Sequence, residues 1–141
     1  MSRIYWDSMM FLYLLEAHPL WGPKVRSVLT EIVRRGDLLC TSAFSIGEVL
    51  TGPRRRGSHS GVDAVKKYFA SGAIDVLPFT EHTADKYGSI CAAVRVSQAD
   101  GVHLATAAEA NIDLFFTNDI GLRKLSVPGI RFFADLDGKI L

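Results

Sequence analysis

The chain contains only two cysteines, Cys40 and Cys91, and their positions exclude a CxxC pair. Clustered cysteines hold structural zinc or form the disulfide frameworks of small secreted domains, so neither feature is indicated. We therefore expect a reduced, cytoplasmic setting. The five prolines and twelve glycines are too few for a collagen-like or low-complexity chain.

Long apolar runs and a strong net charge are also missing. The longest uncharged apolar run near the start, residues 9–15, is far shorter than the ~20 residues that a membrane span needs. It also lacks the basic flank and cleavage site of a signal peptide. The net charge of +1 excludes binding of nucleic acid by bulk charge. Residues 1–70 are nevertheless net basic and residues 71–141 net acidic, so a basic surface can lie beside an acidic site.

The pattern of apolar residues predicts one α/β domain spanning residues 1–141. Short apolar segments with β-type composition predict strands at 3–6, 38–41, 74–78, 114–117 and 130–133. Amphipathic spacing predicts helices at 9–16, 22–36, 43–51, 62–70, 81–96, 101–110 and 119–125, with a loop at 52–61. Five strands separated by helices favour a mostly parallel sheet that is covered on both faces.

Four acidic residues lie where such a sheet displays its functional groups. Asp7 and Asp119 follow the first and fourth strands, Glu48 lies on the helix after the second strand, and Asp100 opens the helix before the fourth. Because the carboxyl ends of parallel strands meet at one edge, these acids are expected to converge. Clustered carboxylates repel one another, and a hard divalent cation such as Mg²⁺ or Mn²⁺ removes that penalty. Such ions most often act on phosphates.

Each acid also has a simpler interpretation. Asp100 and Asp119 could cap their helices, Asp7 could be a turn residue, and Glu48 could pair with an arginine. A nucleotide-binding Rossmann or P-loop protein is not favoured, because the chain has neither GxGxxG after the first strand nor GxxxxGK[ST].

Four segments, residues 4–8, 45–50, 100–107 and 114–119, together resemble the PIN-domain ribonucleases, and most closely the small VapC-like toxins of toxin–antitoxin pairs. The resemblance extends from about Ile4 to Phe133 and implies a three-layer α/β/α fold. It also implies an endoribonuclease that cleaves RNA phosphodiester bonds with Mg²⁺- or Mn²⁺-activated water.

The resemblance assigns roles to individual residues. Asp7, Asp100 and Asp119 would hold the metal, while Glu48 would bind it through water or orient the attacking water. Ser8 and Thr117 match positions whose hydroxyl groups support the site. Two positions depart from the usual pattern. Met9 stands where many relatives have Asn or Ser, and Gly101 stands where Ala is commoner. The glycine is expected to loosen the helix start by under ~1 kcal/mol.

Three further features concern partners. Arg54, Arg55 and Arg56 are expected to form a mobile basic loop that grips RNA phosphates, which Lys66 and Lys67 could extend; the alternative is a solvated run of charge. His103 shares a helix face with Asp100 and is expected to be a buried or hydrogen-bonded structural residue rather than a ligand. The strongly apolar helix at 9–16 suggests, with the resemblance, a protein antitoxin and a homodimer as partners.

Two alternatives to a ribonuclease remain open on the sequence. One is a metal-dependent phosphoesterase that acts on another substrate. The other is a non-catalytic PIN-like module that binds RNA or protein. The presence of all four acids favours an enzyme, because a binding module has no need of a costly carboxylate cluster.

Overall fold

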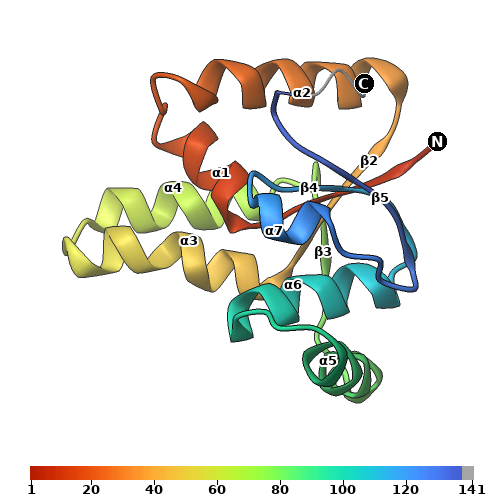
Figure 1. Cartoon of the computed structure of the whole chain (residues 1–141). Helices are drawn as coiled ribbons and strands as arrows, with labels where there is room; N and C mark the ends of the chain where they lie inside the picture. Colours follow the sequence, from red (N-terminus) through yellow and green to blue (C-terminus); the bar gives the residue numbers. More distant parts are fainter. Residues whose placement is uncertain (138–141) are drawn as a thin grey trace.

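The structure, a computed structural model, describes residues 1–137 and contains a five-stranded sheet with helices on both faces (Figure 1). The elements are β1 (Arg3–Trp6), α1 (Ser8–Leu15), α2 (Trp21–Arg35), β2 (Leu38–Ser42), α3 (Ala43–Arg55), α4 (His59–Phe69), β3 (Asp75–Leu77), α5 (Glu81–Ala93), α6 (Gln98–Glu109), β4 (Ile112–Phe116), α7 (Ile120–Arg123) and β5 (Ile130–Ala134). Neighbouring strands pair in parallel in the order β3-β2-β1-β4-β5. The predicted α/β fold is confirmed.

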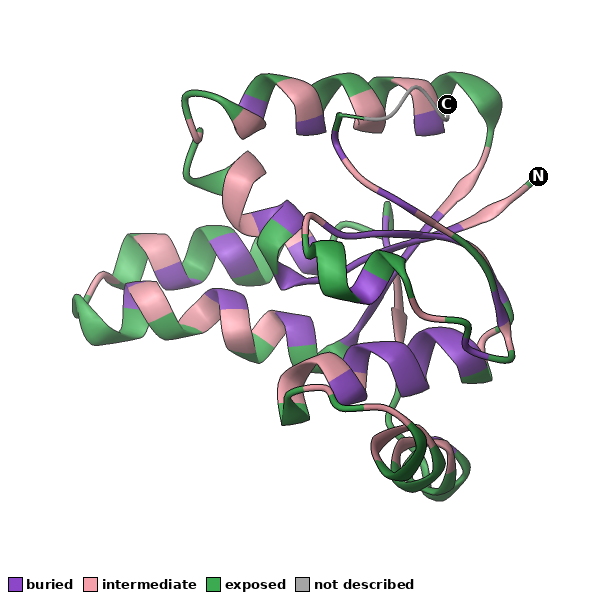
Figure 2. Ribbon diagram, in the orientation of Figure 1, coloured by how far each residue is buried: buried purple, intermediate pink, exposed green. Residues whose placement is uncertain are grey.

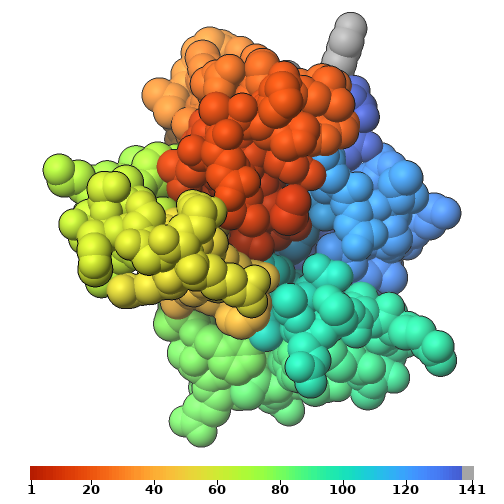
Figure 3. Space-filling model, turned by 90° about the vertical axis from the view of Figure 1, so that its left-hand side faces the viewer, coloured from red at the N-terminus to blue at the C-terminus, as the bar shows by residue number. Residues whose placement is uncertain are grey.

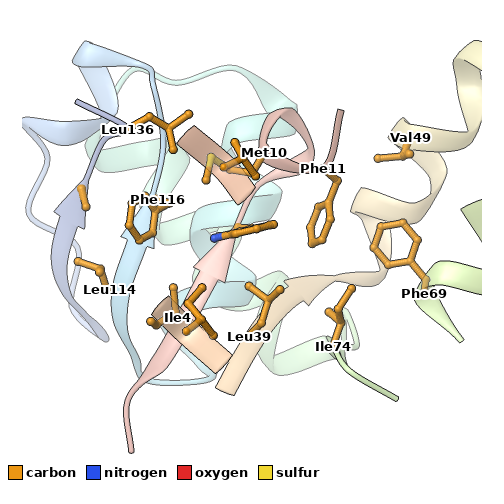
Figure 4. Close-up of a cluster of buried hydrophobic side chains, with 14 of the residues drawn as sticks. Ile4, Met10, Phe11, Leu39, Val49, Phe69, Ile74, Leu114, Phe116 and Leu136 are labelled. Atoms are coloured by element: carbon orange, nitrogen blue, oxygen red, sulfur yellow. The ribbon is translucent and has the colours of Figure 1, made fainter. Parts of the chain in front are cut away.

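Alternation along the central strand β1 produces the layers. Ile4 and Trp6 point into a core that they share with α1, α2, α3 and α4, part of which Figure 4 shows. Tyr5 points to the opposite face, where it packs with Leu104 and other residues of α6. Because successive side chains of a strand point to opposite faces, a fully buried strand such as β1 must be covered twice. Figure 2 shows the result for α6, which is buried along most of its length.

The strand order places a switch point beside β1. The chain adds β2 and β3 on one side of β1, then crosses over through α5 and α6 to add β4 on the other side. Trp6 pairs with Phe116, so that Asp7 and Thr117 follow the ends of two adjacent strands. Open parallel sheets bind their ligands in the crevice at such a point.

The predicted termini are largely correct where local chemistry sets them. Ser42 caps α3 by accepting the N–H of Phe44 at 3.0 Å, and Thr80 forms a capping box with Thr83 at the start of α5. Gly36 ends α2 in the left-handed conformation, with φ of 70°. No helix within residues 1–137 is long and apolar enough to cross a membrane.

The predicted loop at 52–61 is wrong. Helix α3 continues through Gly52 and Pro53 to Arg55, and α4 begins at His59, so the two helices form a hairpin that projects from the sheet (left in Figure 1). Proline lacks the N–H needed inside a helix, but Pro53 is buried between the two helices, close to Gly61. Its burial in the hairpin compensates for the lost hydrogen bond, and the basic triplet therefore ends a helix.

Gly101 has a packing role that its sequence did not reveal. A Cβ atom at this position would lie 2.8 Å from Sγ of Cys91 and 2.9 Å from the ring of Tyr87, both on α5. The missing side chain thus allows α5 and α6 to approach closely. Helix α6 also begins earlier than predicted, at Gln98, and α5 ends at Ala93 because Val94 has extended backbone angles.

Candidate functional site

The four predicted acids lie on segments that meet on one face of the molecule. Figure 3 shows this face, on which α1 (red), α3 (orange to yellow), α6 (teal) and α7 (blue) surround a common centre. Asp7 precedes α1, Glu48 lies on α3, Asp100 lies in the first turn of α6 and Asp119 precedes α7. The centre lies over the carboxyl ends of β1 and β4, as the topology requires.

Asp7 is the most buried of the four acids, with 8% of its surface exposed. Its Oδ1 atom is enclosed and has no hydrogen-bond partner within residues 1–137. Burial raises the pKa of Asp7 from its ordinary value of 3.8 to about 6; the charge of Asp100 adds to this rise, and the backbone N–H of Met10 partly offsets it. An enclosed, unpaired carboxyl oxygen is costly and calls for a ligand or a proton.

Glu48 is bound by a histidine rather than by the arginine considered from the sequence. Nε2 of His103 lies 2.6 Å from Oε1 of Glu48, and Nδ1 lies 2.7 Å from the hydroxyl of Tyr5. Burial raises the pKa of the Tyr5 phenol well above its ordinary value, so the phenol keeps its proton at neutral pH. An ionised carboxylate can only accept, so Nε2 carries a proton and donates to Glu48, and in the neutral ring Nδ1 accepts from the Tyr5 hydroxyl. The expectation of a buried, hydrogen-bonded His103 is confirmed.

Tyr5 is the residue of this site that sequence reasoning missed. It lies two residues before Asp7 in an apolar strand, and nothing in its local sequence distinguishes it from a core aromatic. Its hydroxyl reaches His103 only because β1 and α6, almost a hundred residues apart in the chain, pack against each other.

Asp100 and Asp119 differ in whether their side chains cap a helix. Ser97 caps α6 by accepting the N–H of Asp100 at 3.1 Å, so the interpretation of Asp100 as the helix cap is wrong. Asp119, in contrast, is the cap of α7, because its Oδ1 accepts the N–H of Gly121 at 2.8 Å. Thr117 supports this turn by accepting the N–H of Asp119 at 3.1 Å. Ser8 is buried beside Asp7.

The arrangement of the acids fits a hard cation that takes only one or two of its ligands from the protein. Within residues 1–137, no three Asp, Glu, His or Cys side chains lie close enough together to hold a metal ion. Mg²⁺ commonly binds through one or two carboxylates and keeps several waters. The unpartnered Oδ1 of Asp7 and the neighbouring charge of Asp100 suit such an ion. Glu48 and Asp119 each have one oxygen already engaged by the protein.

A cluster of exposed cations lies on the same helix as Glu48. Arg54, Arg55 and Arg56 are exposed and form no ion pair with any residue of 1–137. The same is true of Lys66 and Lys67, which lie in the last turn of α4. Seven residues, or about two helical turns, separate Glu48 from Arg55, so both lie on one face of α3, about 10 Å apart along its axis. The triplet is therefore held at a set distance from the acids.

Comparison with known proteins identifies the family. A family model described as the PIN domain matches residues 4–128. Comparison with curated protein sequences gives no significant match.

Solved structures with the same fold include several VapBC proteins. The structure of VapBC2 from Rickettsia felis bound to a promoter DNA fragment superposes with a TM-score of 0.75 at 13% identity, covering 94% of this chain and 98% of that one. VapC20 of Mycobacterium tuberculosis, described as a sarcin-ricin loop cleaving toxin, has a TM-score of 0.70 at 17% identity, covering 87% and 96%. VapBC-1 of nontypeable Haemophilus influenzae has a TM-score of 0.68 at 16% identity, covering 96% and 99%.

Proposed function

Because the chain belongs to the PIN-domain family, we propose that it is a Mg²⁺- or Mn²⁺-dependent endoribonuclease, and that it is the toxin of a toxin–antitoxin pair. The observation that carries this proposal is the enclosed, unpartnered Oδ1 atom of Asp7 beside the charge of Asp100 at the switch point of the sheet. The description of a structural neighbour as a sarcin-ricin loop cleaving toxin supports an RNA substrate.

The role of each acid follows from whether its carboxylate oxygens already accept a hydrogen bond from the protein. Asp7 and Asp100 would hold the ion, since neither side chain is used to cap a helix. Glu48 has one oxygen bound by His103 and would use the other to bind the ion through a water molecule. Asp119, whose Oδ1 keeps α7 in place, would reach the ion only through water. The metal ion, when bound, would lower the pKa of water and neutralise charge on the phosphate oxygens.

The basic end of the α3–α4 hairpin would bind the RNA backbone beside the cleavage point. Arg54, Arg55 and Arg56 have no acidic partner within residues 1–137, so their charge is available to phosphates. The spacing of about 10 Å between Glu48 and Arg55 along α3 would place one or two nucleotides between the acids and this contact. Such contacts provide affinity without reading sequence.

The first experiment measures cleavage. The purified protein is incubated with a structured RNA in Mg²⁺, in Mn²⁺ and in EDTA, and we expect cleavage with either metal and none in EDTA. Asp7→Asn and Asp100→Asn should each abolish cleavage, because each removes an ionic ligand. Asp63→Asn and Asp85→Asn, at exposed positions on α4 and α5, serve as matched controls and should cleave normally. Equal activity of Asp7→Asn and wild type would refute the assignment.

The second experiment tests the RNA contact. A variant with Gln in place of Arg54, Arg55 and Arg56 should bind RNA at least tenfold more weakly and show a smaller salt dependence. A variant with Gln in place of Arg26, Arg95 and Lys124 removes the same charge at exposed positions elsewhere. Equal loss of affinity in both variants would show that only the net charge matters and would refute a localised contact.

An antitoxin partner is supported by neighbours that were solved as VapBC or toxin–antitoxin proteins. In this chain a hollow of about 170 Å³ between α1, α3 and α4 is lined by apolar side chains that include Leu12, Leu15 and Val65. Arg56 lies at the same hollow. This hollow would receive apolar side chains of an antitoxin, and exposed Met9 and Leu20 would extend the surface or contribute to a homodimer.

The alternative of a non-catalytic module has one observation in its favour. No three candidate ligands lie within reach of a single ion among residues 1–137. A module of this kind would bind RNA with equal affinity in EDTA and in Mg²⁺ and would leave the RNA intact. The cleavage assay above therefore separates the two functions.

A further inference from the structure

We propose that His103 is a positioning residue that holds Glu48 in its working orientation, and that Tyr5 fixes the ring of His103 for this task. The proposal rests on the proposed nuclease function, because it assigns Glu48 a role at the acidic site. It adds a chain of hydrogen bonds, here called the relay, from Tyr5 on β1 through His103 on α6 to Glu48 on α3.

The hydrogen bonds of the relay run in one direction. An ionised carboxylate can only accept, so Nε2 of His103 carries a proton. In the neutral ring Nδ1 is then an acceptor, and the Tyr5 hydroxyl donates to it across 2.7 Å. Nε2 donates to Oε1 of Glu48 across 2.6 Å, and one carboxylate oxygen of Glu48 is left for the site. Histidine tautomers are commonly set in this way by the partner of the second nitrogen.

Packing prevents the ring from turning. His103 is 3% exposed, and the edges of two aromatic rings, Tyr5 and Phe44, contact it with centroids 5.9 Å and 5.6 Å away. Phe44 lies one helical turn before Glu48 on α3, so it packs against the same histidine that Glu48 binds. The imidazole is thus held from β1 and from α3 at once.

Glu48 needs such support more than the other acids do. A glutamate has more rotatable bonds than an aspartate, and its side chain here is 27% exposed. The donor at Nε2 holds this side chain in one orientation, and partners of this kind orient the ligands of metal sites in general.

Two substitutions at one position separate the two bonds. In His103→Gln the side-chain amide nitrogen can occupy the place of Nε2 and donate to Glu48, while the contact with Tyr5 is lost. In His103→Asn the shorter amide can occupy the place of Nδ1 and keep Tyr5, but it cannot reach Glu48. Both variants remove the aromatic ring, so loss of packing affects them in a similar way.

The first readout is binding of Mn²⁺ to the RNA-free protein, measured by calorimetry, with thermal unfolding of each variant as the control for folding. We expect His103→Gln to bind Mn²⁺ within threefold of wild type and His103→Asn to bind at least tenfold more weakly, the loss typical of removing a partner of a metal ligand. Equal affinity of the two variants would overturn the proposal. If His103→Asn does not fold, Tyr5→Phe replaces it, with an expected loss of at least threefold; unchanged affinity would overturn the proposal.

The second readout tests whether His103 acts through Glu48. In a Glu48→Gln background, His103→Asn should weaken Mn²⁺ binding by less than twofold beyond Glu48→Gln alone. A further tenfold loss would mean that His103 acts by another route and would overturn the proposal. Long-range ¹H–¹⁵N spectra of the metal-free protein should place the His103 proton on Nε2; a proton on Nδ1 alone would also overturn it.

These results can be told apart from failure of the proposed function. Wild-type protein that binds Mn²⁺ with the expected ordering of variants but leaves RNA intact would refute the nuclease and support the positioning role. Cleavage by wild type together with the same kcat and Mn²⁺ affinity in His103→Gln and His103→Asn would support the nuclease and overturn the positioning role.

Discussion

Asp7 combines two requirements that conflict at the scale of a single residue. Its place at the end of β1, followed at once by α1, encloses the side chain, while its role as a ligand needs a charge. Burial raises its pKa to about 6, so ionisation of Asp7 near neutral pH destabilises the metal-free fold. A bound cation would remove this destabilising effect.

Asp7→Asn should therefore stabilise the metal-free protein while it abolishes activity. An ordinary carboxyl ionises near pH 3.8 and Asp7 near pH 6. Between these values the unfolded chain loses its proton first, so the free energy of unfolding falls as the pH rises and then levels off above pH 6. The difference corresponds to about 3 kcal/mol. Urea unfolding in EDTA should show Asp7→Asn more stable by about 1–3 kcal/mol at pH 7.5.

The same variant provides its own control at low pH. Near pH 4 most of this advantage should disappear, because Asp7 is then protonated in the native protein. An advantage that is equally large at pH 4 and pH 7.5 would contradict the account of Asp7 as a buried, reluctantly charged group.

At the scale of elements, the contact between α5 and α6 depends on Gly101. Gly101→Ala should destabilise the fold by about 1–3 kcal/mol, because the added methyl group overlaps Cys91 and the ring of Tyr87. Gly88→Ala is the matched control on α5, where a Cβ atom meets nothing within 4 Å. That change should stabilise the protein by up to ~1 kcal/mol through helix propensity. Thermal unfolding of the two variants measures both effects, and equal shifts would contradict the packing role of Gly101.

Helix α2 begins with an unusual cap. Nδ1 of His18 accepts the N–H groups of Leu20 and Trp21 at 3.2 Å and 3.0 Å, in place of the serine or aspartate common at helix starts. His18→Ala should reduce the free energy of unfolding by about 0.5–2 kcal/mol, measured by urea denaturation. His82→Ala, at an exposed position on α5, should have little effect. A His18→Ala protein as stable as wild type would show that water replaces the cap.

At the scale of the whole molecule, metal binding and folding should be coupled. A ligand that binds only the native state stabilises it by about 2.7 kcal/mol at a hundredfold excess over its Kd. We therefore expect Mn²⁺ to raise the unfolding temperature of the wild-type protein by several degrees. Asp7→Asn should show no such rise, whereas Asp63→Asn, exposed on α4, should keep it. A rise of equal size in all three proteins would indicate binding elsewhere.

Part of this architecture follows directly from local sequence. The period of the apolar residues identified five strands and their helices, and Ser42, Thr80 and Gly36 set helix ends through hydrogen bonds that involve only near neighbours. The basic triplet shows the limit of that reasoning. Gly52 and Pro53 are typical of a loop, but burial of Pro53 against α4 outweighs the lost hydrogen bond and extends the helix.

Some features of the candidate site can likewise be predicted from local sequence, and others cannot. The sequence by itself determined which acids follow the strand ends, because the topology of a parallel sheet brings those ends to one edge. Only the tertiary structure decided that Oδ1 of Asp7 is enclosed without a partner among residues 1–137, that Ser97 rather than Asp100 caps α6, and that His103 contacts both Tyr5 and Glu48. The physical reason is that burial and hydrogen-bond partners depend on segments far apart in the chain, which local patterns of residues do not encode.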